Sequence, residues 1–332
     1  MADLHPVTNA DEPMFRALKL MEGRHKPTRY DREPYWRAPV TPASQQAYVP
    51  SWTWSGVNEL PEGSKALTLD SNGAYLGGMT TVKIAHSDLK RTGSIAHHDL
   101  PAPRAVRPGY YLVKVPYWAF SGSIVSPLGN SARLETEDAV WIAHPTFILL
   151  LELLEEGSLG ELVVFDSYTA KYATDFREWA AALKTVREQL LDDRDEIHPQ
   201  IVPDKCTCPV CTRYNAFKEG YSAALSMMLT GDKCHTRRPD WAHAVMAGYA
   251  ANQWRKAWRF QGTGHPILFM GHVDEITILA ADLHEVLARP KPPFRYDQSG
   301  RALGALKVKD TATEVPEQTP DSIPVHLSED IL

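Results

Sequence analysis

The sequence predicts an α+β fold in which a long helical insertion separates two parts of one antiparallel sheet. Two observations predict it. Short apolar segments at residues 65–70 and 109–118 are bounded by Gly or Pro and rich in β-branched or aromatic residues, as strands are. A largely helical region follows, with one strand-like segment at residues 160–168, and further strand-like segments come at residues 265–279 and 300–310. The sheet is therefore expected to be completed late in the chain.

The expected elements follow one another in a simple order. Residues 145–157 have the apolar pattern of a buried helix, residues 160–168 read as a strand, and three amphipathic helices are expected after it. These helices cover 173–196, 213–229 and 240–260, and a short helix at 280–289 separates the last two strands. The sequence divides into an irregular aromatic and Pro-rich arm (1–60), a first sheet part (61–140), a helical insertion (141–240), a second sheet part (241–310) and an acidic disordered tail (311–332).

Composition narrows the functional classes. The chain has 332 residues and a formal net charge of −6. This charge does not by itself indicate nucleic-acid binding, although a protein with a negative net charge can still have a basic groove. No apolar run approaches the length of a membrane span, and the first residues lack the pattern of a signal peptide. A cytoplasmic protein without a membrane partner is expected.

Two acidic residues lie on predicted strands far apart in the sequence. Asp70 ends the strand of residues 65–70, and Asp274 lies within the strand-like segment 265–279, followed directly by Glu275. A sheet that places these strands side by side would bring the carboxylates together. Hard cations such as Mg²⁺ take oxygen ligands of this kind together with substrate phosphates.

The four cysteines favour a zinc site. Cys206, Cys208 and Cys211 have CxCxxC spacing, and Cys234, or the adjacent His235, offers a fourth ligand. Four Cys, or three Cys and one His, complete a closed tetrahedral zinc site. Such a site would join the end of one helix of the insertion to the next, and its role would be structural.

Several of these segments together resemble the palm and fingers of family B DNA polymerases, particularly the protein-primed branch. In the text "DSNGAY", Asp70, Asn72 and Tyr75 match motif A of that family. The text "MGHVDEI" resembles motif C, with Gly271 at its glycine and Asp274 at its second aspartate. His272 stands where the family has the first aspartate, and Glu275 stands where it has a serine.

The segments between and after these motifs extend the resemblance over residues 66–310. "PGYYLVKV" resembles a strand of the family, Trp141 and Ile142 resemble the start of a helix, and "AALKTVREQL" resembles the fingers helix. "FKEGYSAALSMM" resembles motif B but lacks its asparagine, and "RALGALKVKD" resembles a strand found after motif C.

The resemblance implies a polymerase-type palm, an antiparallel sheet with two helices, and helical fingers that here would carry the zinc site. It implies DNA-directed addition of dNTPs to a 3′-hydroxyl on a primer-template, with two Mg²⁺ or Mn²⁺ ions at the catalytic residues Asp70, Asp274 and Glu275. It also implies a terminal (priming) protein or another replication protein as partner. The expected nucleotide-binding residues are Tyr75 as the sugar gate, Lys184, Arg187, Lys218 and Tyr221. The matched part contains no proofreading exonuclease and almost no thumb.

Two alternatives remain open. The text "CTCPVC" also resembles the zinc motif of tRNA guanine transglycosylases; there Asp70 would be an acid/base in base exchange and Asp166 a nucleophile. Those enzymes are TIM barrels, which need eight β/α repeats, and the sequence shows no such regularity. The chain could instead be a catalytically degenerate palm that binds nucleic acid or a replication protein, because His272 replaces one acidic residue.

Overall fold

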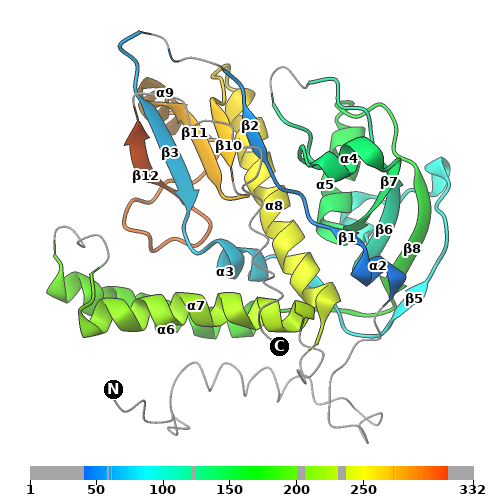
Figure 1. Cartoon of the computed structure of the whole chain (residues 1–332), viewed down its shortest axis with the longest axis horizontal. Helices are drawn as coiled ribbons and strands as arrows, with labels where there is room; N and C mark the ends of the chain where they lie inside the picture. Colours follow the sequence, from blue (N-terminus) through cyan, green and yellow to red (C-terminus); the bar gives the residue numbers. More distant parts are fainter. Residues whose placement is uncertain are drawn as a thin grey trace, which may run out of the picture.

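The computed structural model describes residues 41–57, 60, 62–120, 124–199, 206–230, 237–271 and 273–312 (Figure 1). The first forty residues of the expected arm and residues 313–332 of the expected tail lie outside this description. So do Cys234, His235 and His272. No helix in the described part of the chain combines the length and apolar character that a membrane crossing requires.

The first sheet is fully antiparallel and carries both candidate catalytic segments. Its strand order is β12-β3-β11-β10-β2, so β3, early in the chain, lies between two late strands. The strands are β2 (Thr53–Ser55), β3 (Ala66–Ser71), β10 (Phe269–Gly271), β11 (Glu275–Leu279) and β12 (Leu306–Ala312). The expected late completion of the sheet is confirmed.

A second five-stranded sheet, absent from the sequence prediction, lies on the other side of helix α8 (Pro239–Gln261) (Figure 1). Its order is β1-β7-β6-β8-β5, and only the β1–β7 pair is parallel. Its strands are β1 (Ala47–Tyr48), β5 (Leu89–Arg91), β6 (Gly109–Lys114), β7 (Ala139–Ala143) and β8 (Val164–Ala170). A separate two-stranded sheet pairs β4 (Lys83–Ala85) with β9 (Ala173–Asp175).

The remaining helices cover and connect these sheets. They are α2 (Pro42–Gln45), α3 (Ala74–Met79), α4 (Ala132–Thr136), α5 (His144–Glu155), α6 (Arg177–Ile197), α7 (Pro209–Thr230) and α9 (Ala280–Leu287), with 3₁₀ turns at His97–Asp99 and Pro103–Ala105. Helices α6 and α7 lie side by side across one end of α8 (Figure 1). Helix α8 packs on α3, α5 and α7.

Two apolar clusters hold these parts together. The larger one joins both five-stranded sheets through α5 and the C-terminal half of α8, where Trp254 and Phe260 are fully buried. The smaller one joins α3, α6 and α7 to the N-terminal half of α8. Because α8 contributes to both clusters, it is the element on which the sheets and the helical pair are assembled.

Three local expectations are wrong. Residues 47–48 and 53–55, in the arm that was expected to be irregular, form strands. Strand β1 belongs to the second sheet and strand β2 to the first. Trp141 and Ile142 lie in strand β7 and do not open a helix, which begins at His144. The segment 265–279 is a hairpin, β10 and β11, and not one strand.

The general class is confirmed as α+β. The described strands form open and mainly antiparallel sheets, whereas a transglycosylase would need eight parallel strands closed into a barrel. The fold therefore removes the structural basis of that alternative.

Candidate active site and metal centre

Asp70 lies near the end of β3, where the chain turns sharply into α3. Gly73 makes this turn with a φ of 57°, and a Cβ there would lie 2.7 Å from a methyl group of Leu303. Glycine avoids both costs. The Asn72 amide group is buried and donates to the carbonyl oxygen of Asp297 at 2.8 Å. The "DSNGAY" text thus folds as strand, turn and helix, and the turn is fixed by the loop that precedes β12.

Asp274 lies in the turn between β10 and β11. Gly271 pairs with Glu275, so Val273 and Asp274 lie in the turn of this hairpin. Val273 has a φ of 72°, and among the described residues it is the one non-glycine with a positive φ. This conformation is costly for a β-branched side chain, and such residues cluster at functional sites.

The sheet register brings the charged side chains together. Asp70 is directly opposite Glu275 on β11 and opposite Lys307 on β12. Two facing carboxylates repel each other, and a facing lysine offsets that repulsion. Lys309, two residues further along β12, forms an ion pair with Glu275.

The pKa values of the two aspartates reflect burial and mutual repulsion. Burial, followed by the charges of Asp70 and Glu275, raises the pKa of Asp274 to about 7. Burial also raises the pKa of Asp70, while Lys307 and Lys309 oppose that rise. The two aspartates are thus within electrostatic reach of each other, as the sequence predicted for one site.

Three of the predicted nucleotide-binding residues surround these carboxylates. Burial and the charge of Asp274 raise the pKa of Tyr75, whose ring makes an edge contact with Tyr249 of α8 at 5.9 Å between centroids. On α7, Lys218 is exposed and its charge acts on Asp70. Tyr221, also on α7, is buried and within electrostatic reach of Asp70.

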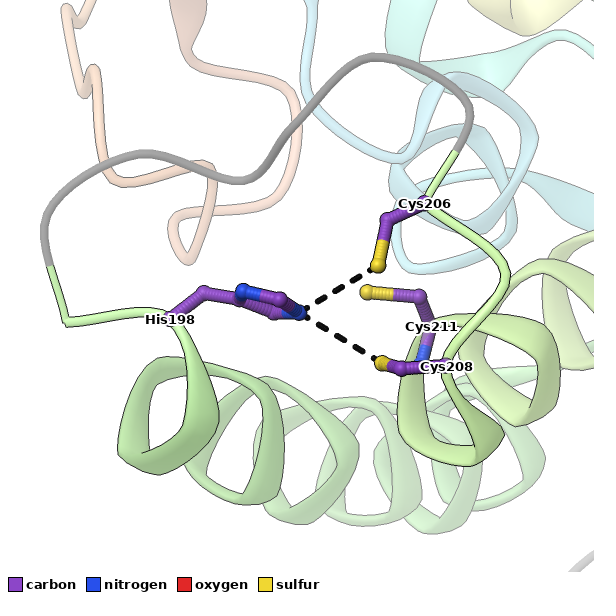
Figure 2. Close-up of side chains that lie close together, drawn as sticks. All are labelled: His198, Cys206, Cys208 and Cys211. Carbon is purple, nitrogen blue, oxygen red and sulfur yellow. Dashed lines mark hydrogen bonds between the residues drawn. The ribbon is translucent and has the colours of Figure 1, made fainter.

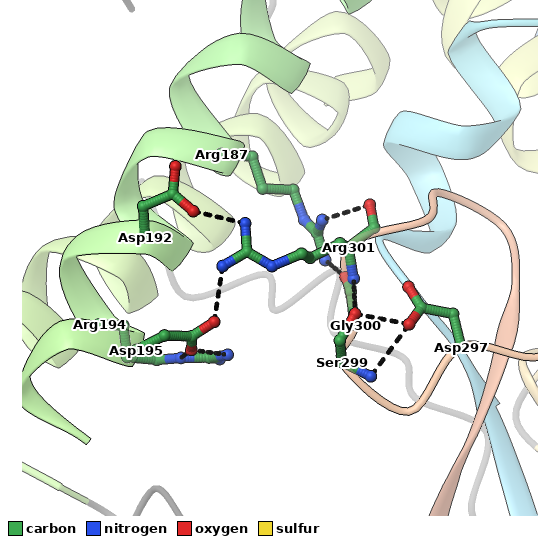
Figure 3. A network of polar contacts seen from close by, with 8 residues as sticks. All are labelled: Arg187, Asp192, Arg194, Asp195, Asp297, Ser299, Gly300 and Arg301. Carbon is green, nitrogen blue, oxygen red and sulfur yellow. Dashed lines mark hydrogen bonds and ion pairs between the residues drawn. The ribbon is translucent and has the colours of Figure 1, made fainter. Parts of the chain in front are cut away.

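The two basic residues predicted on α6 lie in different surroundings. Lys184 is exposed and pairs with Glu188 at 3.5 Å. Arg187 is 2% exposed, because it occupies the helix face that also buries Leu183 and Leu191. Its guanidinium donates to the carbonyl oxygen of Arg301 at 3.1 Å and to that of Gly300 (Figure 3). Arg187 therefore joins α6 to the loop before β12, and its donors face protein carbonyls.

A second contact joins the same helix and loop. The Arg301 guanidinium donates to Asp192 and to Asp195, each at 2.6 Å (Figure 3). Within the loop, Asp297 accepts from the Ser299 side chain at 2.5 Å and from the Ala302 backbone at 2.6 Å. Because this loop also holds Asn72, the position of α6 and the turn after Asp70 are fixed by one segment.

The cysteine segment forms a compact cluster with a histidine that the sequence prediction missed. His198 caps the end of α6, while Cys206 and Cys208 precede α7 and Cys211 lies in its first turn. The His198 Nε2 atom is 3.4 Å from the sulfur of Cys206 and 3.4 Å from that of Cys208. All four ligand atoms lie within 4.8 Å of one another (Figure 2).

This cluster could hold a metal ion such as zinc. Three thiolates and one imidazole are a normal donor set for Zn²⁺. A hydrogen bond from the Cys211 backbone, followed by one involving His198, lowers the pKa of Cys208 to about 6, which favours the thiolate that binds metal. The predicted ligands Cys234 and His235 lie outside the described residues, and His198 already supplies a fourth ligand within them. A search upstream of the CxCxxC run for a helix-ending histidine would have found it.

The carboxylates form a more open arrangement than this cluster. In the described part of the chain no second group of three such ligand atoms gathers within the same distance. Half-buried carboxylates that repel one another nevertheless fit a divalent cation, whose charge would relieve the repulsion. Mg²⁺ in particular takes one or two carboxylates and completes its shell with water and phosphate oxygens.

The raised pKa of Asp274 predicts a pH-dependent stability. Its pKa is about 7 in the folded protein and about 3.9 in an unfolded chain, so the folded state binds the extra proton between those values. The contribution of Asp274 to stability is complete below pH 4 and is lost as the pH rises through 7, with a slope of up to about 1.4 kcal/mol per pH unit. Denaturant unfolding at pH 5, 6 and 7 without added Mg²⁺ or Mn²⁺ measures it. The difference in the free energy of unfolding between wild type and Asp274→Asn isolates the contribution of Asp274. A difference that does not change with pH would contradict the prediction.

The buried position of Arg187 predicts a structural effect of its replacement. Arg187→Met removes donors from two carbonyl groups in a buried position and is expected to lower the free energy of unfolding by about 1–3 kcal/mol. The matched change Lys184→Met on the exposed face of α6 should alter it by less than about 0.5 kcal/mol. Denaturant unfolding of both variants checks this, and equal effects would show that the Arg187 contacts do not stabilise the fold.

The fold is similar to that of solved DNA polymerase structures. Phi29 DNA polymerase in an orthorhombic crystal form matches with a TM-score of 0.55 and 12% identity, over 91% of this chain and 52% of that one. The same polymerase in a ternary complex with primer-template DNA and incoming nucleotide matches with a TM-score of 0.53 and 11% identity, over the same shares. No protein-family model matches the chain, and no curated protein does. The chain has a fold like that of phi29 DNA polymerase and spans about half the length of that polymerase.

Proposed function

We propose that this chain is a DNA polymerase-type nucleotidyltransferase that adds dNTPs to the 3′-hydroxyl of a DNA primer. One observation carries the proposal. The register of β3 and β11 places Asp70 opposite Glu275, and Asp274 precedes Glu275 in the hairpin turn. Two aspartates from distant parts of the chain therefore meet at one edge of a polymerase-like sheet.

The carboxylates of Asp70 and Asp274 are the groups that would hold two divalent cations, with Glu275 beside them. Bound there, the cations would supply the positive charge that the attacking hydroxyl and the triphosphate require. Lys218 on α7, whose charge acts on Asp70, would bind the phosphates, while Tyr221 would pack beside the nucleotide. Tyr75, next to Asp274, would lie against the sugar and disfavour a 2′-hydroxyl.

Two basic residues of α6, Lys184 and Arg187, have different roles in this proposal. Lys184 is exposed and able to exchange its partner Glu188 for a phosphate, so we keep it as a nucleotide-binding residue. Arg187, also predicted to bind nucleotide, is buried against carbonyl groups, and its role is to hold α6 in place.

We also propose one structural zinc ion at His198, Cys206, Cys208 and Cys211. The four side chains come from the ends of α6 and α7, so the metal would close the tip of the helical pair (Figure 2). Neither helix end packs in the larger apolar cluster. A closed tetrahedral metal site would therefore stabilise these helix ends in place of apolar burial.

Replacement of either aspartate is expected to abolish DNA synthesis. Asp70→Asn and Asp274→Asn should each lower incorporation of labelled dNTPs into primed DNA by about 100-fold or more, because each removes a carboxylate that would hold a cation beside the reacting phosphates. The assay uses Mg²⁺ or Mn²⁺ and compares primed with unprimed DNA.

Asp166→Asn is the matched control, because Asp166 is an aspartate on β8 of the other sheet, paired with Arg91 at 2.9 Å. Its activity should stay near that of wild type. Incorporation that survives both site variants would contradict the proposal. DNA binding without incorporation by the wild type would favour the degenerate palm, and guanine exchange into tRNA that depends on Asp166 would favour the transglycosylase alternative.

The metal centre predicts about one zinc per chain. Cys208→Ser and His198→Ala should lose the metal and leave the remaining thiols open to titration, and both should lower the unfolding temperature. Cys234→Ser should keep both the metal and the stability of the wild type. Metal analysis and thiol titration measure this, and zinc lost only with Cys234→Ser would show that His198 is not the ligand.

A further inference from the structure

Helix α8 places one buried amide between the two segments that carry the aspartates. The Gln253 side chain is 0% exposed. Its Nε2 atom donates to the backbone carbonyl of Asp274 at 2.8 Å, and its Oε1 atom accepts from the hydroxyl of Ser71 at 2.9 Å. Ser71 directly follows Asp70, so a single side chain contacts both strand ends.

The orientation of this amide is determined by its third partner. Lys256, one turn further along α8, donates to Gln253 Oε1 at 3.0 Å and to the Ser71 hydroxyl oxygen at 2.9 Å. An ammonium group only donates, so the amide oxygen must face it and the NH₂ group must face Asp274. A buried network whose polar groups are paired in this way is rigid and specifies one arrangement.

The sheet alone does not fix the two aspartates relative to each other. Asp70 is paired in the ladder with Glu275 and Lys307. Asp274 lies before β11, in a turn that contains the strained Val273, and it belongs to no paired position of the ladder. A contact from outside the sheet is therefore needed to hold Asp274 at a set distance from Asp70, and Gln253 provides it.

We propose that Gln253 is a positioning residue that fixes Asp274 relative to Asp70 and thereby sets the affinity of this site for divalent cations. The inference rests on the proposed function, because it assumes that these aspartates bind the cations. Groups that orient metal ligands typically change metal affinity by about 10- to 100-fold when they are removed.

Three variants distinguish the contact of Gln253 with Asp274 from its contact with Ser71, which follows Asp70. Gln253→Glu keeps an oxygen for Ser71 and Lys256 but sets a second oxygen against the Asp274 carbonyl, so it breaks only the Asp274 side. Ser71→Ala breaks only the Asp70 side. Gln253→Leu breaks both. The control is Gln261→Leu, the same change at the C-terminal end of α8.

The first readout is Mn²⁺ binding to the full chain, measured by calorimetry and by the electron paramagnetic resonance signal of the free ion. The second readout is the Mg²⁺ dependence of dNTP incorporation. We expect Gln253→Glu to weaken Mn²⁺ binding by about 10-fold and Gln253→Leu by more, up to about 100-fold. Gln261→Leu should bind like the wild type. Incorporation by Gln253→Glu should recover at high Mg²⁺, which a general loss of folding would not allow.

The outcomes separate the inference from the proposed function. If Asp70→Asn and Asp274→Asn bind Mn²⁺ as tightly as the wild type, the proposed function fails. If they lose Mn²⁺ while Gln253→Glu and Ser71→Ala keep wild-type affinity, the function stands and the positioning role of Gln253 is overturned. An equal loss in Gln261→Leu would also overturn it, since that would reflect loosening of α8. Should Gln253→Leu fail to fold, Gln253→Glu and Ser71→Ala still decide the question.

Discussion

The pairing of β3 with β11 is the interaction on which the candidate site depends. Leu69 is buried beside Asp70, and Ile276 and Ile278 are buried on β11, so the register is set by apolar side chains. A slip of one residue would turn these side chains to the opposite face and separate Asp70 from Glu275. The part of the chain between these two adjacent strands contains β5, β6, β7 and β8 of the second sheet and the α6–α7 pair. The folding of that long insertion is therefore a condition for forming the site.

Nearby lysines offset part of the repulsion among the carboxylates of the candidate site. Burial is the largest cause of the raised pKa values of Asp70 and Asp274, and repulsion from Glu275 adds to it in both. Lys307 and Lys309 on β12 offset part of this repulsion. The lysines provide positive charge without covering the site, because the Lys309 side chain is about half exposed. A basic strand beside an acidic edge is also consistent with contacts to a phosphate backbone, even though the whole chain carries a net charge of −6.

The sequence predicted those features that depend on local pattern. The long helices and strand β3 were predicted from periodicity, and the late strand that meets β3 was predicted from the apolar text around Asp274. The hairpin turn was missed because Val273 takes a positive φ that no valine pattern signals. The burial of Arg187 was not predicted, because a basic residue at helical spacing looks solvent-facing, whereas tertiary contacts with Gly300 and Arg301 bury it. His198 was missed because it precedes the CxCxxC run, where no ligand was expected, whereas Gln253 meets Ser71 and Asp274 only in the folded chain.

Gln253 and His198, which the sequence prediction missed, and Arg187, whose burial it missed, share a physical property: each joins separate elements of the fold. Gln253 joins α8 to β3 and to the hairpin turn, Arg187 joins α6 to the loop before β12, and His198 joins α6 to α7. That loop also bonds Asn72, so contacts made by α6 and α8 converge on the turn that follows Asp70. Carboxylates can be recognised by residue type and strand position, but the groups that fix their separation are ordinary polar side chains. Their role depends on burial between elements, and burial is a property of the assembled core rather than of any local segment.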